Sequence, residues 1–77
     1  MTVEEVLNLC QEYNVEIYLR YDFIPDTLII RTRKDQFEIE RAISARAVHL
    51  AGFELTFRII LRDMAAELDR KAKEAKA

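Results

Sequence analysis

Two stretches of this chain alternate apolar and polar side chains, and they constrain its fold more than any other feature. In the first stretch, residues 15–22, the apolar side chains are Val15, Ile17, Leu19 and Tyr21. The residues between them are Glu16, Tyr18, Arg20 and Asp22. Because side chains alternate between the two faces of a β-strand, this pattern predicts a strand with one buried and one exposed face.

The second stretch, LIIRTRKDQFEIER at residues 28–41, alternates on both sides of the central pair Lys34 and Asp35. It therefore predicts two strands joined as a hairpin. Pro25 and Asp26, which precede the stretch, suit the middle of a turn after the first strand. The sequence thus predicts three antiparallel strands in succession.

A two-residue turn at Lys34-Asp35 would set the register of this hairpin. It would pair Arg31 with Glu38, Ile30 with Ile39 and Ile29 with Glu40, so that inward residues match across the strands. Lys-Asp is an unusual sequence for such a turn, which favours Asn-Gly or Asp-Gly. A longer, bulged connection therefore stays open.

The start of the chain predicts a helix over residues 3–13. Thr2 and Glu5 have the spacing of a capping box, in which each side chain bonds the backbone amide of the other. The apolar residues at helical spacing are Val3, Val6, Leu7, Cys10 and Tyr13. Asn14 suits the left-handed conformation that closes a helix.

The second half of the chain predicts two more helices. Ser44 suits the N-cap of a short helix over 45–51, and Gly52, the only glycine, suits its end. Residues 53–61 alternate like a strand, but apolar residues also recur at helical spacing. This helical set is Phe57, Ile60, Leu61, Met64 and Leu68. Because it continues beyond residue 61, we predict one helix over about 54–74, and a strand over 53–61 stays open.

Together these elements predict an α+β fold in one small domain spanning residues 1–77. We expect the helices to cover one face of the three-stranded sheet. The side chains expected beneath them are Val15, Ile17, Leu19, Ile30, Phe37 and Ile39. The other face, which we call the open sheet face, consists of Glu16, Tyr18, Arg20, Asp22, Ile29, Arg31, Arg33, Glu38 and Glu40.

Composition narrows the class of protein. A 77-residue chain that is about half apolar is long enough for one small core and too apolar for a disordered protein. Its one cysteine excludes an internal disulfide. No signal peptide opens the chain, and its apolar runs are too short to cross a bilayer. We therefore expect a cytoplasmic protein that does not associate with membranes.

The sequence carries no recognisable catalytic or metal-binding pattern. His49 is the only histidine, and it lies on a different predicted helix from Cys10. A typical zinc site needs several such ligands, and a reactive cysteine needs basic neighbours. With a single glycine, no glycine-rich phosphate loop can form. We expect neither enzymatic activity, nor a metal, nor a cofactor.

The open sheet face is the candidate binding site. Its residues that could contact a partner are Tyr18, Arg20, Ile29, Arg31, Arg33, Glu38 and Glu40. Arginine and tyrosine are enriched among residues that dominate binding energy at protein interfaces. A small regulator that binds nucleic acid with the basic and aromatic residues of this face is the alternative. The net charge of −2 and the interleaved carboxylates disfavour a phosphate backbone.

A second candidate surface lies on the predicted long helix. Ile59 falls away from the main apolar stripe, next to Leu55 and Arg62 by helical spacing. An isoleucine in this position suggests a seam between two copies of the chain. We therefore expect a homodimer as a second mode of association.

The segments NVEIYLRYDF, TLIIRTRKDQFEIERAIS and RAVHLAGFEL resemble parts of small uncharacterised proteins encoded by phages and prophages. The order of helix, three strands and C-terminal helix is also similar to that of some small phage-encoded inhibitors of host defence, including certain anti-CRISPR proteins. This resemblance implies an inhibitor that binds a larger protein or protein complex of the host, such as a nuclease. It implies no particular site residues.

Overall fold

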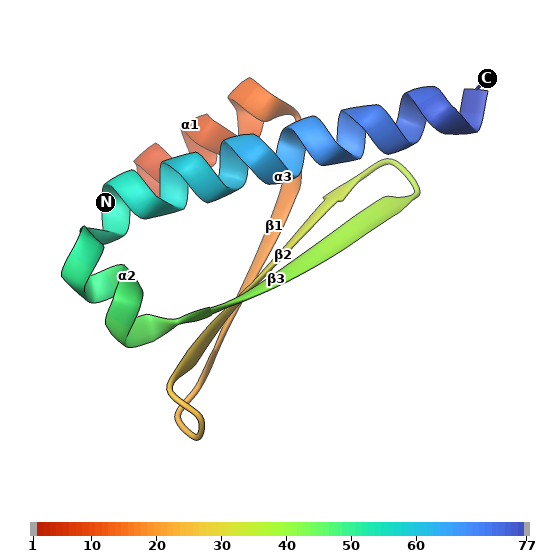
Figure 1. Ribbon diagram of the computed structural model, residues 1–77. Coiled ribbons are helices and arrows are strands. Elements are labelled where there is room, and N and C mark those ends of the chain that lie inside the picture. Colours follow the sequence, from red (N-terminus) through yellow and green to blue (C-terminus); the bar gives the residue numbers. More distant parts are fainter. Residues whose placement is uncertain (1, 77) are drawn as a thin grey trace.

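The computed structural model describes residues 2–76 and shows the predicted α+β domain (Figure 1). Its elements, in chain order, are α1 (Val3–Tyr13), β1 (Glu16–Asp22), β2 (Thr27–Lys34), β3 (Phe37–Ser44), α2 (Ala45–Ala51) and α3 (Phe53–Lys76). The strands form one antiparallel sheet in the order β1-β2-β3. The predicted succession of elements is therefore confirmed.

The predicted cap residues lie at the ends of α1 and α2, although Glu5 does not complete the capping box, since its Oε2 has no hydrogen-bond partner. Thr2 accepts a hydrogen bond from the backbone amide of Glu5 at 3.2 Å, at the start of α1. Asn14 closes α1 with φ of 55°, and Ser44 accepts a bond from the amide of Ala47 at the start of α2. Gly52 has φ of 94°, a conformation that other residues rarely adopt, and it allows the chain to turn between α2 and α3.

The strand interpretation of residues 53–61 is wrong, because these residues form the first part of α3. The buried residues of the helix are Phe57, Leu61, Met64, Ala65 and Leu68. Their spacing of three and four residues places them on one side of a helix, whereas a strand would place Leu55 and Leu61 on the same face. The helical spacing of apolar residues continues beyond residue 61, and residues 53–61 therefore form a helix.

The predicted turn at Lys34-Asp35 is wrong by one residue. Lys34 pairs with Phe37, so the turn consists of Asp35 and Gln36. Asp35 has φ of 56°, a left-handed conformation that aspartate tolerates better than most residues. Arg31 consequently lies opposite Glu40, and Arg33 lies opposite Glu38. The β3 partner of each β2 residue is thus two residues later in the chain than predicted. Because residues two apart in a strand point to the same face, each side chain nevertheless keeps its predicted face.

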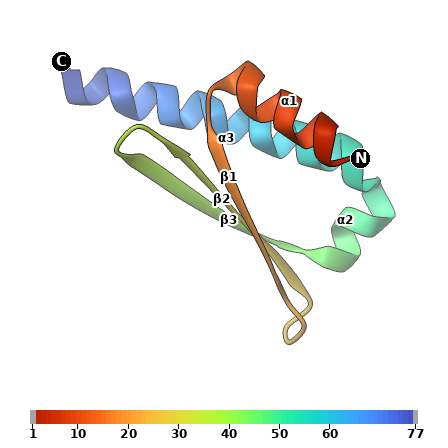
Figure 2. The same ribbon diagram turned by 180° about the vertical axis from the view of Figure 1, so that it is seen from behind.

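The helices lie on one side of the sheet and share one core with it. In Figures 1 and 2, α3 crosses above β2 and β3, while α1 lies beside the start of β1. The buried core residues are Leu9, Val15, Ile30, Ile39, Phe57, Leu61, Met64, Ala65 and Leu68. They come from α1, the sheet, α3 and, for Val15, the link between α1 and β1, so these parts pack as a single domain.

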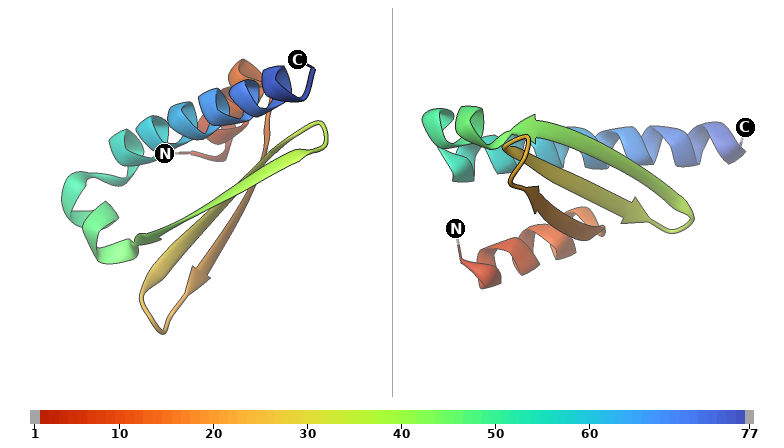
Figure 3. Two further views of the ribbon diagram at one scale, coloured as in Figure 1. Left: turned by 45° about the vertical axis from the view of Figure 1, so that its right-hand side comes forward. Right: turned by 90° about the horizontal axis from the view of Figure 1, so that it is seen from below.

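One predicted core residue is exposed. Leu19 faces the helix side of the sheet, but 48% of it remains accessible, and Tyr21 on the same side is 52% exposed. Figure 3 shows the reason: the β1–β2 end of the sheet extends beyond the helices. Ile17 and Phe37, also predicted to be inward, are partly buried against the core.

Two charged residues also face the helices. Lys34 forms an ion pair with Asp69, and Arg41 forms one with Glu67, so both connect the sheet to α3. The alternation of β2 and β3 places these side chains inward, next to Thr32 and Ile39. They attach the helix to the sheet at the border of the apolar core.

Candidate functional site

The structure brings the predicted contact residues together on the open sheet face. Cross-strand pairs are Tyr18 with Arg31 and Arg20 with Ile29 between β1 and β2. Because residues directly opposite each other share a face, these four side chains are neighbours. Glu38 and Glu40 of β3 complete the face opposite Arg33 and Arg31. The helices lie on the other side of the sheet (Figure 3).

Arg31 is the centre of this face. Its Nε lies 3.2 Å from Oε1 of Glu38, and its Nη2 lies 3.2 Å from Oε2 of Glu40. Arg31 does not lie opposite Glu38 as predicted, but the two side chains still form an ion pair, which runs diagonally between the strands. All three side chains are between 43% and 47% exposed, so each pair contributes only about 0–1 kcal/mol to folding.

The other charged groups of the face are also engaged locally. Arg20 lies 3.1 Å from Asp22 on the same strand, and the Tyr18 hydroxyl donates to Glu16 at 3.4 Å. Arg33 donates from Nε to the backbone oxygen of Asp35 at 3.3 Å. The face therefore presents interleaved positive and negative charges rather than a uniformly basic surface.

A shallow hollow of about 130 Å³ opens at the β1 side of this face. It is lined by Tyr18, Leu19, Arg20, Ile29 and Arg31. Ile29 is half-buried and apolar, while a tyrosine and two arginines surround it. An apolar centre with such a rim is the arrangement in which a partner's side chain can be anchored.

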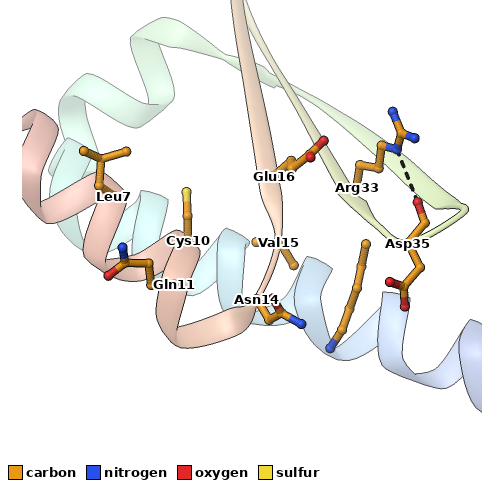
Figure 4. Close-up of a pocket in the computed structure, with 9 residues that line it drawn as sticks. Leu7, Cys10, Gln11, Asn14, Val15, Glu16, Arg33 and Asp35 are labelled. Carbon is orange, nitrogen blue, oxygen red and sulfur yellow. Dashed lines mark hydrogen bonds between the residues drawn. The ribbon is translucent and has the colours of Figure 1, made fainter.

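A larger groove, of about 470 Å³, lies between α1 and the β2–β3 hairpin (Figure 4). Leu7, Cys10 and Gln11 line it from α1, and Arg33, Lys34 and Asp35 line it from the hairpin. Burial raises the pKa of the Cys10 thiol above its ordinary value. Sequence reasoning missed this groove, because no local pattern relates α1 to a hairpin about twenty-five residues later.

An apolar hollow of about 260 Å³ was also not foreseen. It lies between the uncovered end of the sheet, α2 and the start of α3, and is lined by Tyr21, Leu28, Ala45, Val48, His49 and Phe53. The Tyr21 hydroxyl donates to Asp26, and this bond raises the pKa of Tyr21. The hollow follows from the exposure of the β1–β2 end of the sheet.

The candidate seam on α3 is exposed. Leu55 and Ile59 are among the exposed large apolar residues, and Arg62 is exposed one turn further along. Their spacing of four and three residues places them on the same side of α3, away from its buried stripe. The structure therefore places these three residues on one exposed side of α3.

The two residues considered for metal binding or nucleophilic chemistry lie on different helices. His49 lies on α2 and Cys10 on α1. Across residues 2–76, no three histidine, cysteine, aspartate or glutamate side chains gather in a group that could hold a metal ion. Over the same residues, no helix combines the length and apolar character needed to cross a membrane.

Comparison of the chain with protein-family models, with curated proteins and with solved structures finds no match to any of them.

Proposed function

We propose that this protein is a non-enzymatic binding module that covers a surface of a larger protein with its open sheet face. The observation that carries the proposal is the arrangement around Arg31, whose guanidinium is held between Glu38 and Glu40 beside Tyr18. Side chains held in place before binding lose less conformational entropy when a partner docks. A partner with a complementary charge pattern would recognise this surface.

The charges of the face support a protein partner over a nucleic acid. The basic residues are Arg20, Arg31 and Arg33, whereas the acidic residues are Glu16, Asp22, Glu38 and Glu40. Three positive and four negative charges give the face no net attraction for phosphates. Mixed charges around the apolar Ile29 instead suit the polar rim and apolar centre of a protein interface.

The resemblance to small phage-encoded inhibitors suggests the class of partner. On this basis the protein would bind a host nuclease or a defence complex and inhibit it by occluding the surface that receives its substrate. The mechanism needs no chemistry from the small protein. It requires only that the open sheet face occupies most copies of the target, so that the concentration of the small protein exceeds its Kd.

Affinity capture from bacterial lysate, followed by nuclease assays on the captured protein, tests this proposal. The Arg31→Glu and Tyr18→Ala variants should lose the captured protein. The matched control is Arg70→Glu, which makes the same charge change on α3, on the helix side of the molecule, and should retain it. The purified parent protein should then inhibit the captured enzyme, and Arg31→Glu should not.

Two results would contradict the proposal. The first is a captured protein that binds the Arg31→Glu and Tyr18→Ala variants as well as it binds the parent. The second is tight oligonucleotide binding that weakens steeply with salt, since this would support the nucleic-acid alternative.

A further inference from the structure

The two edge strands of the sheet, β1 and β3, differ in the charge of their helix-side residues, and this difference affects whether each edge can pair with another chain. On the helix side, the edge strand β3 carries a charged residue, Arg41, which pairs with Glu67. The helix-side residues of β1 are Ile17, Leu19 and Tyr21, and none of them is charged. An inward-facing charge on an edge strand is a known protection against pairing with another chain. Strand β1 lacks this protection.

Strand β1 is also accessible over much of its length. It pairs with β2 on one side, and none of the described residues forms a strand on its other side. Helix α1 lies beside the start of β1, while the rest of the strand runs away from it toward the β1–β2 turn (Figures 1 and 2). The exposure of Leu19 and Tyr21 shows that this part of the strand is uncovered.

We propose that two copies of this chain pair through β1 in antiparallel orientation, which joins their sheets into one sheet of six strands. The twofold axis passes between the Tyr18 residues of the two copies. In this register Ile17 lies opposite Leu19 of the second copy on the helix side. The backbone groups left unpaired at the edge of β1 then form hydrogen bonds across the axis.

The charges of the open sheet face select this register. In each copy, Glu38 lies opposite Arg33, and Arg33 lies opposite Glu16. Pairing about Tyr18 places Arg20 of the second copy opposite Glu16, so the row continues with alternating sign across the axis. Pairing about Leu19 would instead oppose Glu16 to Asp22, two like charges.

The apolar residues at the two ends of β1 support the same arrangement. Leu7 of α1 is exposed near the start of the strand, and Phe23 and Ile24 are exposed in the turn that follows its end. Antiparallel pairing brings the turn of one copy to the α1 end of the other. Apolar surface from both copies is then removed from water at each end of the shared strands.

The test uses two charge-reversal variants, Glu16→Arg and Arg20→Glu, with molar mass measured by light scattering over a concentration series. The parent protein should approach twice its monomer mass of 9.1 kDa as its concentration rises. Each variant alone should remain at the monomer mass, because like charges oppose each other twice in its dimer. An equimolar mixture of the two variants should regain the doubled mass, because both pairs in the mixed dimer are complementary.

The mixture also controls for folding, since a variant that failed to fold could not restore the dimer. Leu19→Lys, which adds the missing inward charge to β1, should give a monomer with an unchanged circular dichroism spectrum. A parent protein that stays monomeric at millimolar concentration would overturn the proposal. A mixture of the two charge-reversal variants that stays monomeric would also overturn it. So would a dimer that the Ile59→Glu variant loses and the Leu19→Lys variant keeps, because that dimer would form through α3.

This pairing does not depend on the proposed function. The side chains of Tyr18 and Arg31 remain on the open sheet face after the edge of β1 is used, so one dimer would present two such faces side by side. A variant that still dimerises but no longer captures the partner would show that the dimer alone does not account for capture. A variant that no longer dimerises but still captures the partner would show that capture does not need the dimer. These two outcomes therefore distinguish the two proposals.

Discussion

At the scale of single residues, most charged side chains of the open sheet face form ion pairs with one another, whereas Lys34 and Arg41 on the helix side pair with Asp69 and Glu67 of α3. Arg31 forms exposed ion pairs with Glu38 and Glu40. Such pairs contribute little to stability, because water and salt screen them. Residues of the open sheet face are therefore free to serve recognition, and replacing them should leave the fold intact.

Thr32 is the exception among the polar residues, because it lies in the core. It is fully buried, and its hydroxyl has no hydrogen-bond partner. We predict that Thr32→Val, which replaces this hydroxyl with a methyl group of similar size, raises the free energy of unfolding by about 1 kcal/mol. Urea denaturation measures the change. Thr32→Ser, which keeps the hydroxyl and removes the methyl group, should lower stability, and a loss of stability in the valine variant would contradict the prediction.

Cys10 should react slowly with alkylating reagents in the folded protein. Burial raises its pKa, so at any pH below that value less of the reactive thiolate is present than in an ordinary cysteine. The rate of alkylation by iodoacetamide should keep rising above pH 9.0, the ordinary value for this group. The same protein unfolded in urea is the control, and its rate should level off at lower pH. Equal profiles for the folded and unfolded chain would refute this expectation.

The same pKa shift has a consequence for stability. Since the folded pKa is higher than the unfolded one, the unfolded chain loses its thiol proton first as pH rises. The contribution of Cys10 to stability is therefore complete below the unfolded pKa and is lost as the pH rises through the folded pKa.

At the scale of secondary-structure elements, α3 organises the molecule. Its buried stripe covers β2 and β3, and its Glu67 and Asp69 hold Arg41 and Lys34 of the sheet. The helix therefore decides which part of the sheet is covered. The β1–β2 end beyond its reach keeps Leu19 and Tyr21 exposed.

Two leucines of α3 should respond very differently to truncation. Leu61 is 0% exposed, whereas Leu55 is 63% exposed. We predict that Leu61→Ala lowers the free energy of unfolding by about 2–5 kcal/mol and that Leu55→Ala changes it by less than about 0.5 kcal/mol. Chemical denaturation of both variants gives the comparison. Equal losses would indicate the strand pattern over residues 53–61, in which both leucines share a face.

At the scale of the whole molecule, the core is so small that association with a second chain would add substantially to stability. A domain of this size is stabilised by only about 3–5 kcal/mol from its core, and several large apolar residues remain exposed. Pairing through β1 would bury part of that surface. It would also join two open sheet faces into one larger surface for a partner.

Self-association should therefore appear in thermal unfolding. Because a dimer is stabilised by mass action, we predict that the Tm of the parent protein rises with its concentration, by up to about 5 °C for each tenfold increase. Differential scanning calorimetry at several concentrations measures this shift. Leu19→Lys should have a Tm that does not change with concentration, and a parent Tm that is equally constant would argue against pairing.

Much of the candidate site could be predicted from the sequence. Alternation in β1 and β2 assigned Tyr18, Arg20, Arg31 and Arg33 to one face, and this assignment survived the shift of the hairpin turn. The details of contact could not be predicted. Arg31 reaches both Glu38 and Glu40 because of the actual register, which depends on the left-handed conformation of Asp35 in the turn.

The sequence by itself determined the type of every element except over residues 53–61, the caps of α1 and α2, and the face on which each strand residue lies. These properties arise from neighbouring residues, through the periods of helix and strand and the hydrogen bonds of the caps. Only the tertiary structure decided how far the helices reach along the sheet. That reach depends on how α1 and α3 pack over the strands, and it leaves β1 with an uncovered edge and an exposed Leu19.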